Sequence, residues 1–300
     1  VDYRNGHYRN FSFPIMKLFL SKRAKELFFA LFISSISFAQ TPIFEISGNG
    51  LQKPSYLTGT LHLGCEKAQL VPVSFMEYLK KSEALVLEMN LKKVSEQIKI
   101  TTKAMVPKER SLDRLMGERY PEFKSKVQQQ YQLDVTALER FHPMMTTSLL
   151  AAKLLPCSKP KGSETIFMDA ADSLKIPLFG LETASEQANV LFSIPDSEAV
   201  RSLWDMGTNR PKAQQEWDEL QHVFHQGNID SIAKFIEESD EMKMDLEKML
   251  FQRNRNWMKT LPALMKKKSV FIAVGAGHLG GSHGLVALLR EAGYTVVEKQ

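Results

Sequence analysis

Two short motifs of the same pattern constrain the fold most, because they lie near opposite ends of the chain. Residues 59–62 (Gly-Thr-Leu-His) and residues 275–278 (Gly-Ala-Gly-His) each follow an apolar, β-type run. A strand that ends at a glycine places its next side chains at the carboxyl edge of a sheet, where α/β folds gather their ligands. A closed fold is needed to bring such distant edges together, and it would place His62 and His278 at one site.

The first 39 residues have the layout of a secretory leader. Met16 is followed by basic residues, by the apolar run 27–38 and by a small-x-small sequence that ends at Ala39. This predicts a signal peptide cut after Ala39, with translation beginning at Met16 and residues 40–300 forming one mature domain. The alternative is a membrane anchor, but spanning needs about 20 apolar residues and this run is shorter. We therefore expect a secreted or periplasmic protein with no stable membrane span after leader removal.

The basic charge of the chain belongs mainly to this leader. The chain has 39 Lys and Arg residues against 34 Asp and Glu residues. Six of the basic and two of the acidic residues lie in positions 1–39, so the remainder has a net charge of +1. A nearly neutral mature part argues against a nucleic-acid partner.

The mature part contains two cysteines, Cys65 and Cys157. An even pair in an exported protein favours a disulfide, with two buried thiols as the alternative. Because Cys65 lies three residues after His62, a bridge would brace the loop that carries this histidine.

Short apolar runs and long helical stretches alternate along the chain. Residues 91–155 and 183–262 have the pattern of helices, with prolines marking breaks in the first stretch. This order predicts an α/β fold with a central mixed sheet and large helical insertions, and the two Gly-x-x-His units suggest an ancient duplication. Strands are expected at residues 43–47, 56–62, 83–88, 177–181, 269–274 and 294–297, and shorter helices at 71–82, 165–174 and 285–291.

Four of the expected strands end in a residue that could bind a metal: His62, Glu88, Glu182 and His278. Imidazole and carboxylate groups together suit zinc, manganese or iron. A catalytic site would leave one position for water, and one glutamate could act as general base instead of ligand. The alternative is that both histidines bond backbone at buried turns and both glutamates are helix caps or ion-pair partners. The chain has no HExxH motif, which excludes a zinc protease site built on one helix.

Two further features of the sequence offer other chemistry. Arg253, on a helix, could bind a carboxylate or a substrate anion bidentately, or simply cover the surface. Residues 275–280 also fit Gly-x-Gly-x-x-Gly, with Glu298 at a spacing typical of dinucleotide-binding folds. The other strands of such a unit would have to come from elsewhere, and nicotinamide cofactors are scarce outside the cytoplasm. We therefore do not expect a dinucleotide.

The motifs, in this order, resemble the TraB/GumN family, which is related to the Tiki proteins. The segments that carry the resemblance are YLTGTLHLG, ALVLEMN, IPLFGLETASEQ, RNRNW and VGAGHLGGSHGLVALLREAGYTV, and they extend over nearly the whole mature chain. Around Glu164, where relatives often carry Gly-Leu/Val-Asp, this chain has Gly-Ser-Glu, so no role is carried over there. Bacterial members are linked to peptide pheromone shutdown or to polysaccharide gene clusters.

The resemblance also implies roles for the site residues. Tiki members are regarded as metal-dependent proteases that rely on paired GxxH motifs and glutamate. This implies His62 and His278 as ligands of a divalent metal ion such as zinc or manganese, and Glu88 and Glu182 as further ligands or general base.

These observations lead to one expectation and two alternatives. We expect an exported metal-dependent hydrolase that acts on peptides or another small extracellular substrate, in which a histidine or Arg253 steadies the oxyanion. One alternative is a non-catalytic protein that sequesters a peptide in the same cleft. The other is an esterase-type hydrolase without metal, suggested by distant similarity to erythromycin-esterase-like folds.

Overall fold

The computed structural model describes residues 42–65, 70–239 and 245–299. The leader expected at residues 16–39 lies outside these described residues. Within the described ranges, no helix combines the length and the apolar character that crossing a membrane requires.

The described strands form one six-stranded sheet in the order β4-β3-β5-β2-β1-β6. The strands are β1 (Ile43–Gly48), β2 (Ser55–Thr60), β3 (Ala84–Leu87), β4 (Leu178–Gly180), β5 (Val270–Gly275) and β6 (Tyr294–Lys299). Neighbouring strands β4, β3, β5 and β2 are parallel, whereas β1 runs antiparallel to both β2 and β6. The expected mixed sheet is therefore confirmed, and four parallel strands end at one edge.

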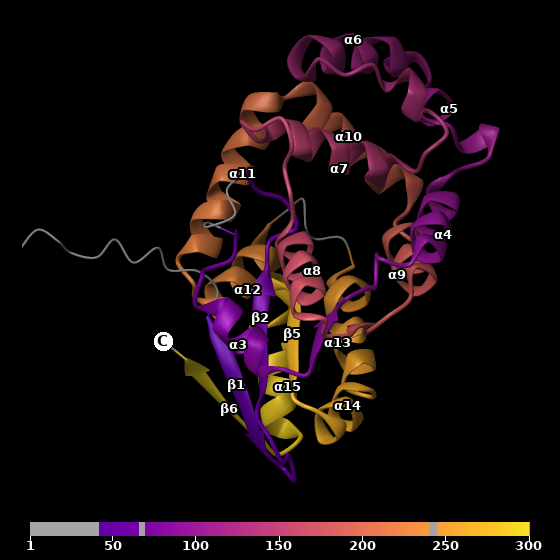
Figure 1. The fold of residues 1–300 in the computed structure, drawn as a ribbon. Coiled ribbons are helices and arrows are strands. Elements are labelled where there is room, and N and C mark those ends of the chain that lie inside the picture. Colours follow the sequence, from indigo (N-terminus) through magenta and orange to yellow (C-terminus); the bar gives the residue numbers. More distant parts are fainter. Residues whose placement is uncertain (1–41, 66–69, 240–244, 300) are drawn as a thin grey trace, which may run out of the picture. The chain divides into compact units, whose positions relative to one another are not determined.

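Helices cover both faces of this sheet (Figure 1). On β5, Val270, Ile272 and Val274 pack against one helical layer, and Phe271 and Ala273 pack against the other. A parallel strand covered on both faces is apolar throughout, which is why this run shows no polar alternation. The first layer contains α13 (Gln252–Trp257), α14 (Leu261–Lys267) and α15 (Leu285–Glu291), and the second contains α3 (Phe75–Lys81) and α8 (Ser163–Leu174).

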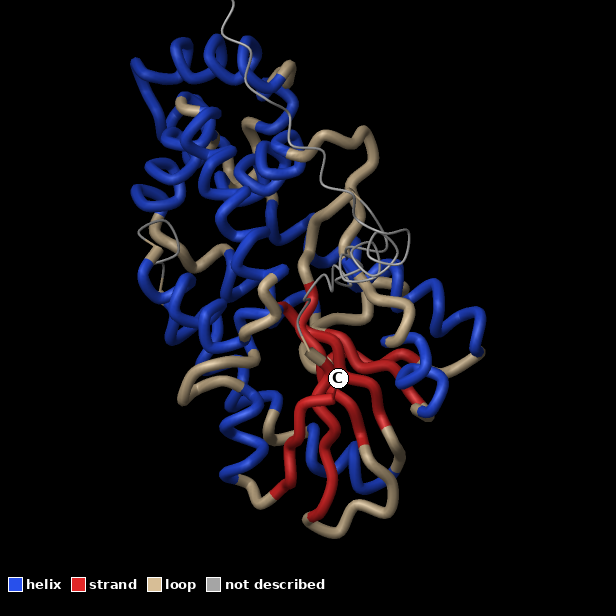
Figure 2. The backbone as a smooth tube through the Cα atoms, turned by 90° about the vertical axis from the view of Figure 1, so that its left-hand side faces the viewer, coloured by secondary structure: helices blue, strands red, loops and turns tan. Residues whose placement is uncertain are grey.

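The two helical insertions together build a second core, apart from the sheet. Buried side chains of α5 (Leu112–Met116), α6 (Tyr120–Tyr131), α7 (Pro143–Leu154) and α10 (Asp196–Thr208) pack together there, and Figures 1 and 2 show these helices gathered away from the strands. The helices between β3 and β4 are α4 (Val94–Ala104), η1 (Lys108–Arg110), α5 (Leu112–Met116), η2 (Gly117–Arg119), α6 (Tyr120–Tyr131), η3 (Val135–Leu138), α7 (Pro143–Leu154) and α8. Between β4 and β5 lie α9 (Ala184–Leu191), α10 (Asp196–Thr208), α11 (Arg210–His225), α12 (Ile229–Glu238), the π-helix η4 (Glu247–Phe251), α13 and α14. The expected helical insertions are confirmed.

The prolines of the first insertion mark helix starts. Pro121 and Pro143 lie in the first turns of α6 and α7, and Pro107 precedes η1. A proline in the first turn removes no intrahelical hydrogen bond and has the backbone angle that a helix needs. The expected breaks are therefore junctions between successive helices.

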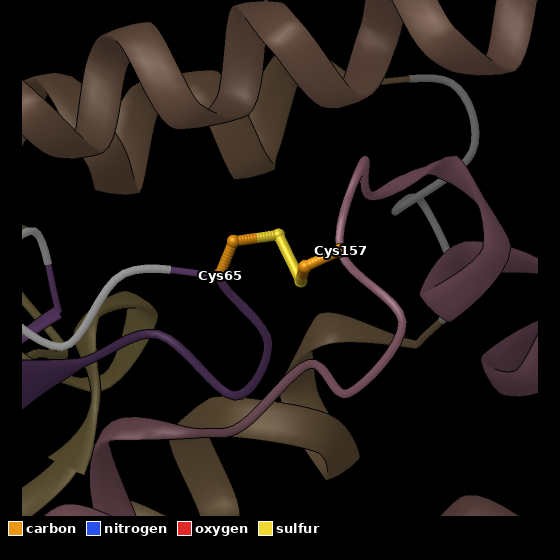
Figure 3. The surroundings of a disulfide bond; sticks show 2 residues. All are labelled: Cys65 and Cys157. Atoms are coloured by element: carbon orange, nitrogen blue, oxygen red, sulfur yellow. A yellow bond between two sulfur atoms is a disulfide. The ribbon is translucent and has the colours of Figure 1, made fainter.

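The disulfide expected between Cys65 and Cys157 is present (Figure 3). It joins the loop after β2 to the segment that precedes α8. Beside it, Gly64 and Lys161 form an antiparallel bridge with two N–H···O hydrogen bonds of 2.9 Å. The bridge and these hydrogen bonds hold together two segments that are far apart in the sequence.

Candidate functional site

The sheet brings the four strand-end residues to the same edge. His62 follows β2, and His278 ends the short helix η5 (Ala276–His278), directly after the neighbouring strand β5. Glu88 is the first residue after β3, and Glu182 lies two residues after β4. Because these strands are parallel neighbours, the residues at their carboxyl ends lie together. Their roles as ligands or bases stay predictions.

Arg253 of α13 links three of these residues. Its Nη2 lies 2.6 Å from Glu88 Oε2 and 2.6 Å from Glu182 Oε1, and its Nε donates to Glu182 Oε2 at 3.1 Å. Its Nη1 donates to the Met249 carbonyl at 3.0 Å and to His278 Nε2 at 3.1 Å. A guanidinium has five N–H groups, and these contacts use all of them. The oxyanion contact expected of Arg253 would therefore require one of these hydrogen bonds to open.

The carboxylates of this cluster accept further hydrogen bonds. Glu88 Oε1 accepts the N–H of Gly275 at 2.8 Å, and Glu88 Oε2 accepts Gln187 Nε2 at 3.1 Å. Gln187 faces the cluster from α9, whose start is fixed by a capping box at Thr183. All four carboxylate oxygens of Glu88 and Glu182 are thus engaged.

The cluster is buried as well as ionic. The side chains of Arg253, Glu88 and Glu182 are no more than 9% exposed. Burial acts to raise the pKa of Glu88, but His278 when protonated and the Arg253 guanidinium outweigh it and hold this pKa well below its usual range. For Glu182 burial dominates and raises the pKa, despite its hydrogen bonds to Arg253. Glu88 is therefore the more firmly ionised carboxylate of the two.

His278 is buried, and its partners define its tautomer. Asn254 Nδ2 donates to the carbonyls of His278 and His283 at 3.2 and 2.9 Å. Asn254 Oδ1 is consequently the acceptor for His278 Nδ1–H at 2.7 Å, which leaves the Nε2 lone pair facing Arg253. Burial lowers the pKa of His278 to about 3, so the ring is neutral at physiological pH.

His62 is the accessible histidine of the site, with a side chain that is 65% exposed. Its Nδ1 lies 2.7 Å from Glu164 Oε1, and Thr60 Oγ1 donates to the same oxygen at 2.5 Å. The Glu164 carboxylate raises the pKa of His62 to about 9. Burial acts to raise the pKa of Glu164, but the interaction with His62 lowers it overall. A carboxylate on Nδ1 orients the ring and leaves Nε2 for another partner.

No role was expected for Glu164 from the sequence. The nearby Gly162 is the feature that could have indicated one, because it allows a close approach of two segments. A Cβ at Gly162 would lie 2.5 Å from the carbonyl oxygen of His62, so only glycine lets the start of α8 approach the loop after β2 this closely. Ser163 then links the two segments, because its Oγ accepts the Leu61 N–H at 3.2 Å. These contacts bring Glu164 to a histidine 102 positions away.

The donor chemistry beside Gly275 suits a divalent metal ion. A Cβ at Gly275 would lie 3.1 Å from both His62 Nε2 and Glu88 Oε1, so the glycine leaves this position open. His278 Nε2 lies 3.8 Å from the same Glu88 oxygen. Two imidazole nitrogens and one carboxylate oxygen fit zinc, manganese or iron. As the side chains stand, the described part of the chain has no group of three or more His, Cys, Asp or Glu residues arranged around an ion, and His278 Nε2 accepts from Arg253 instead.

The site lines a cavity of about 660 Å³, a volume typical of small-molecule sites. His62, Glu88, Arg253 and His278 are among its lining residues, together with Glu164. Glu182 accepts a hydrogen bond from Arg253, but it is not one of the residues that line the cavity. Most of the remaining lining side chains are apolar.

Comparisons with known proteins cover nearly the whole described chain. The model of the TraB/PrgY/gumN family matches residues 42–298. The uncharacterized protein YbaP of Shigella flexneri is 24% identical over 256 residues, which represent 83% of this chain and 92% of YbaP. No solved structure matches the chain significantly. The matched range includes β1 to β5, all of β6 except Lys299, and both Gly-x-x-His motifs.

Proposed function

The chain belongs to the TraB/PrgY/gumN family, and from this premise we propose that it is an exported, metal-dependent hydrolase. The observation that carries the proposal is the position of His62 Nε2 and Glu88 Oε1 beside Gly275, with His278 Nε2 3.8 Å from the same Glu88 oxygen, at a cavity of ligand size. The disulfide supports export, because such bonds persist in oxidising compartments.

In this proposal, His62 Nε2, Glu88 Oε1 and His278 Nε2 would hold the ion. When bound, a divalent ion supplies Lewis-acid polarisation of a carbonyl group and a nucleophilic water near neutral pH. Glu164 orients His62 through Nδ1. Arg253 holds the Glu88 carboxylate in place and keeps it ionised.

For Glu182 we propose a different role from the ligand or general base that its motif implies. Both of its oxygens accept hydrogen bonds from Arg253, and it does not line the cavity. We assign it as the counter-ion that keeps the guanidinium in place, with no contact to substrate. Arg253 is likewise a positioning residue, because all its N–H groups are used within the cluster.

A specific observation favours a second candidate, a hydrolase that needs no metal. The His62–Glu164 pair is complete as it stands, and the pKa of about 9 leaves His62 protonated at neutral pH when no ion binds Nε2. A protonated imidazole facing the cavity could stabilise an oxyanion or protonate a leaving group. Arg253 already occupies His278 Nε2, which is consistent with this candidate.

Metal content and chelation separate the two candidates. We expect the protein, purified without chelators, to contain about one equivalent of zinc, manganese or iron, because three protein donors and one water would complete a catalytic site once His278 Nε2 exchanges Arg253 for the ion. EDTA should abolish hydrolysis in a panel of fluorogenic peptides and esters, and the same metal should restore it. Hydrolysis that survives EDTA would support the metal-free candidate. Peptide binding without metal or hydrolysis would favour a non-catalytic binding protein.

Replacing Glu164 by glutamine tests the orientation of His62. The substitution preserves the size of the side chain but removes the charge that holds Nδ1–H. We expect metal affinity or kcat/KM to fall about 10- to 100-fold, as for other partners of ligating histidines. The ¹⁵N shifts of the His62 ring should also move, which a purely structural role would not cause. Glu122→Gln, on the exposed side of α6, is the matched control; equal effects of both substitutions would contradict the role.

A further inference from the structure

Two helices, α8 and α9, reach the site. On each of them the cavity lining changes from polar to apolar within one helical turn. On α8, Glu164 contacts His62, and Met168 lines the cavity one turn later. On α9, Gln187 contacts Glu88, and Leu191 lines the cavity one turn later. Residues four positions apart lie on the same face of a helix, so each helix presents one polar and one apolar group to the same space.

The helix that carries Arg253 repeats this arrangement in the opposite direction. Leu246, Met249 and Leu250 lie seven, four and three positions before Arg253, and all four residues line the cavity. Because they line the same cavity, these residues lie on one face of the η4–α13 segment. The segment thus forms an apolar wall that leads to the guanidinium.

Two more helices complete the apolar part. Phe224 of α11 and Ile232 of α12 pack with Ala276, the residue after β5. The same cavity is lined by a polar cluster, which consists of Thr60, His62, Glu88, Glu164, Gln187, Arg253 and His278. Leu220 and Ile236 lie one turn from Phe224 and Ile232, respectively, and also line the cavity. Leu220 therefore lines the apolar part of the cavity one turn of α11 away from Phe224, the residue that packs against the end of β5.

Hydrogen-bonding groups are scarce on this wall. Among the described lining residues, the side chains outside the polar cluster that can form hydrogen bonds are Ser148 and Thr165. The Ser148 hydroxyl already donates to the Met144 carbonyl at 2.9 Å. The remaining wall side chains are those of leucine, isoleucine, methionine, phenylalanine and alanine.

This wall discriminates between two classes of substrate. An extended peptide has an N–H and a C=O at each residue, and burying them without partners costs free energy. An alkyl chain has no such groups, and each methylene moved from water into an apolar wall favours binding about fourfold. The wall therefore suits an alkyl chain better than a peptide backbone.

We propose that this cavity binds the alkyl chain of an acyl ester or acyl amide, with the carbonyl group at the polar cluster. The inference rests on the proposed hydrolase function and narrows its substrate class. In the reaction, water adds its hydroxyl to the acyl carbon as the C–O or C–N bond breaks, and the departing alcohol or amine takes the proton. The products are a fatty acid and that alcohol or amine.

Chain-length preference tests the proposal. We compare kcat/KM for p-nitrophenyl acetate, octanoate and laurate, and measure dodecanoate binding by calorimetry. The wild type should prefer laurate over acetate by about 100-fold or more. Leu220→Trp fills the wall and should lower this preference at least tenfold and weaken dodecanoate binding. Leu149→Trp, on the exposed face of α7, is the matched control and should leave the preference unchanged.

The binding measurement separates this proposal from the hydrolase function. Dodecanoate binding that Leu220→Trp weakens, without hydrolysis of any ester or amide, supports the alkyl site and overturns the hydrolase. Hydrolysis of short esters or hydrophilic peptides with no chain-length preference and no dodecanoate binding overturns the alkyl site and leaves the hydrolase standing. If Leu220→Trp and Leu149→Trp reduce the chain-length preference and dodecanoate binding equally, the alkyl site is also overturned.

Discussion

Replacement of Arg253 by methionine is expected to lower the free energy of unfolding by about 3–5 kcal/mol, the loss typical of breaking a buried ion pair from one side. The substitution removes the partner of two carboxylates, Glu88 and Glu182, that are 8% exposed. It also removes the N–H that faces His278. Chemical denaturation at neutral pH measures the loss, and hydrolysis should fall with it because Glu88 and His278 lose their fixed positions.

The pH dependence and a neighbouring arginine provide the controls. Without Arg253, the buried glutamates should have raised pKa values in the folded state, so they contribute stability at low pH that is lost as the pH rises. The penalty of the substitution should therefore shrink as the pH falls toward 4.5, the ordinary pKa of glutamate. Arg255→Met, which removes an exposed ion pair with Glu247 on the same helix, should cost less than about 1 kcal/mol. Similar losses for both variants would show that Arg253 does not organise the site.

Replacement of His62 by alanine is expected to reduce kcat/KM by about 10²–10⁴-fold, the range for loss of a positioned acid, base or ligand. In contrast to Arg253, the His62 side chain is largely exposed, so the melting temperature should change little. Bound metal should fall below stoichiometry in the same preparation, because Nε2 is one of the three expected donors. Activity and metal content are measured on the folded variant.

An exposed histidine elsewhere gives the comparison for this result. His222 lies on α11, where its ring contacts Gln226, and His222→Ala should leave both metal content and activity unchanged. Full activity in His62→Ala would contradict the proposed hydrolase site. The non-catalytic binding protein would then be the favoured alternative. Lost activity with retained metal would instead favour the metal-free use of the His62–Glu164 pair.

Local patterns in the sequence were sufficient to predict the strands of the sheet. The apolar run of β5 and the glycine that ends it are visible in six residues, and β2 shows a shorter apolar pair, Tyr56 and Leu57, before Gly59. The rule that ligands gather at the carboxyl ends of parallel strands then placed His62, Glu88 and His278 at one edge. Each of these steps depends on residues that are close in sequence, which is why they could be predicted.

The partners of individual side chains could not be obtained in this way. From the sequence, an arginine in the run RNRNW can bind either a substrate anion or a structural carboxylate. The positions of five separate acceptors show that Arg253 binds structural carboxylates. Glu164 lies 102 residues from His62, in a segment whose approach depends on Gly162 and on the disulfide. The apolar wall likewise combines helices from both insertions, and no single segment shows it.

The strand order has a consequence for the time at which the protein can fold. β5 occupies the position between β3 and β2, so the two early pairs β1–β2 and β3–β4 are joined to each other only through a strand that is made much later. Sheets made of such distant pairings fold slowly, because long loops must close before the contacts stabilise them. On a ribosome that has not yet made residue 270, His62 and Glu88 already exist but have no central strand between them. The edge that carries the site is therefore completed only after β5 has been made, long after the strands that hold His62 and Glu88.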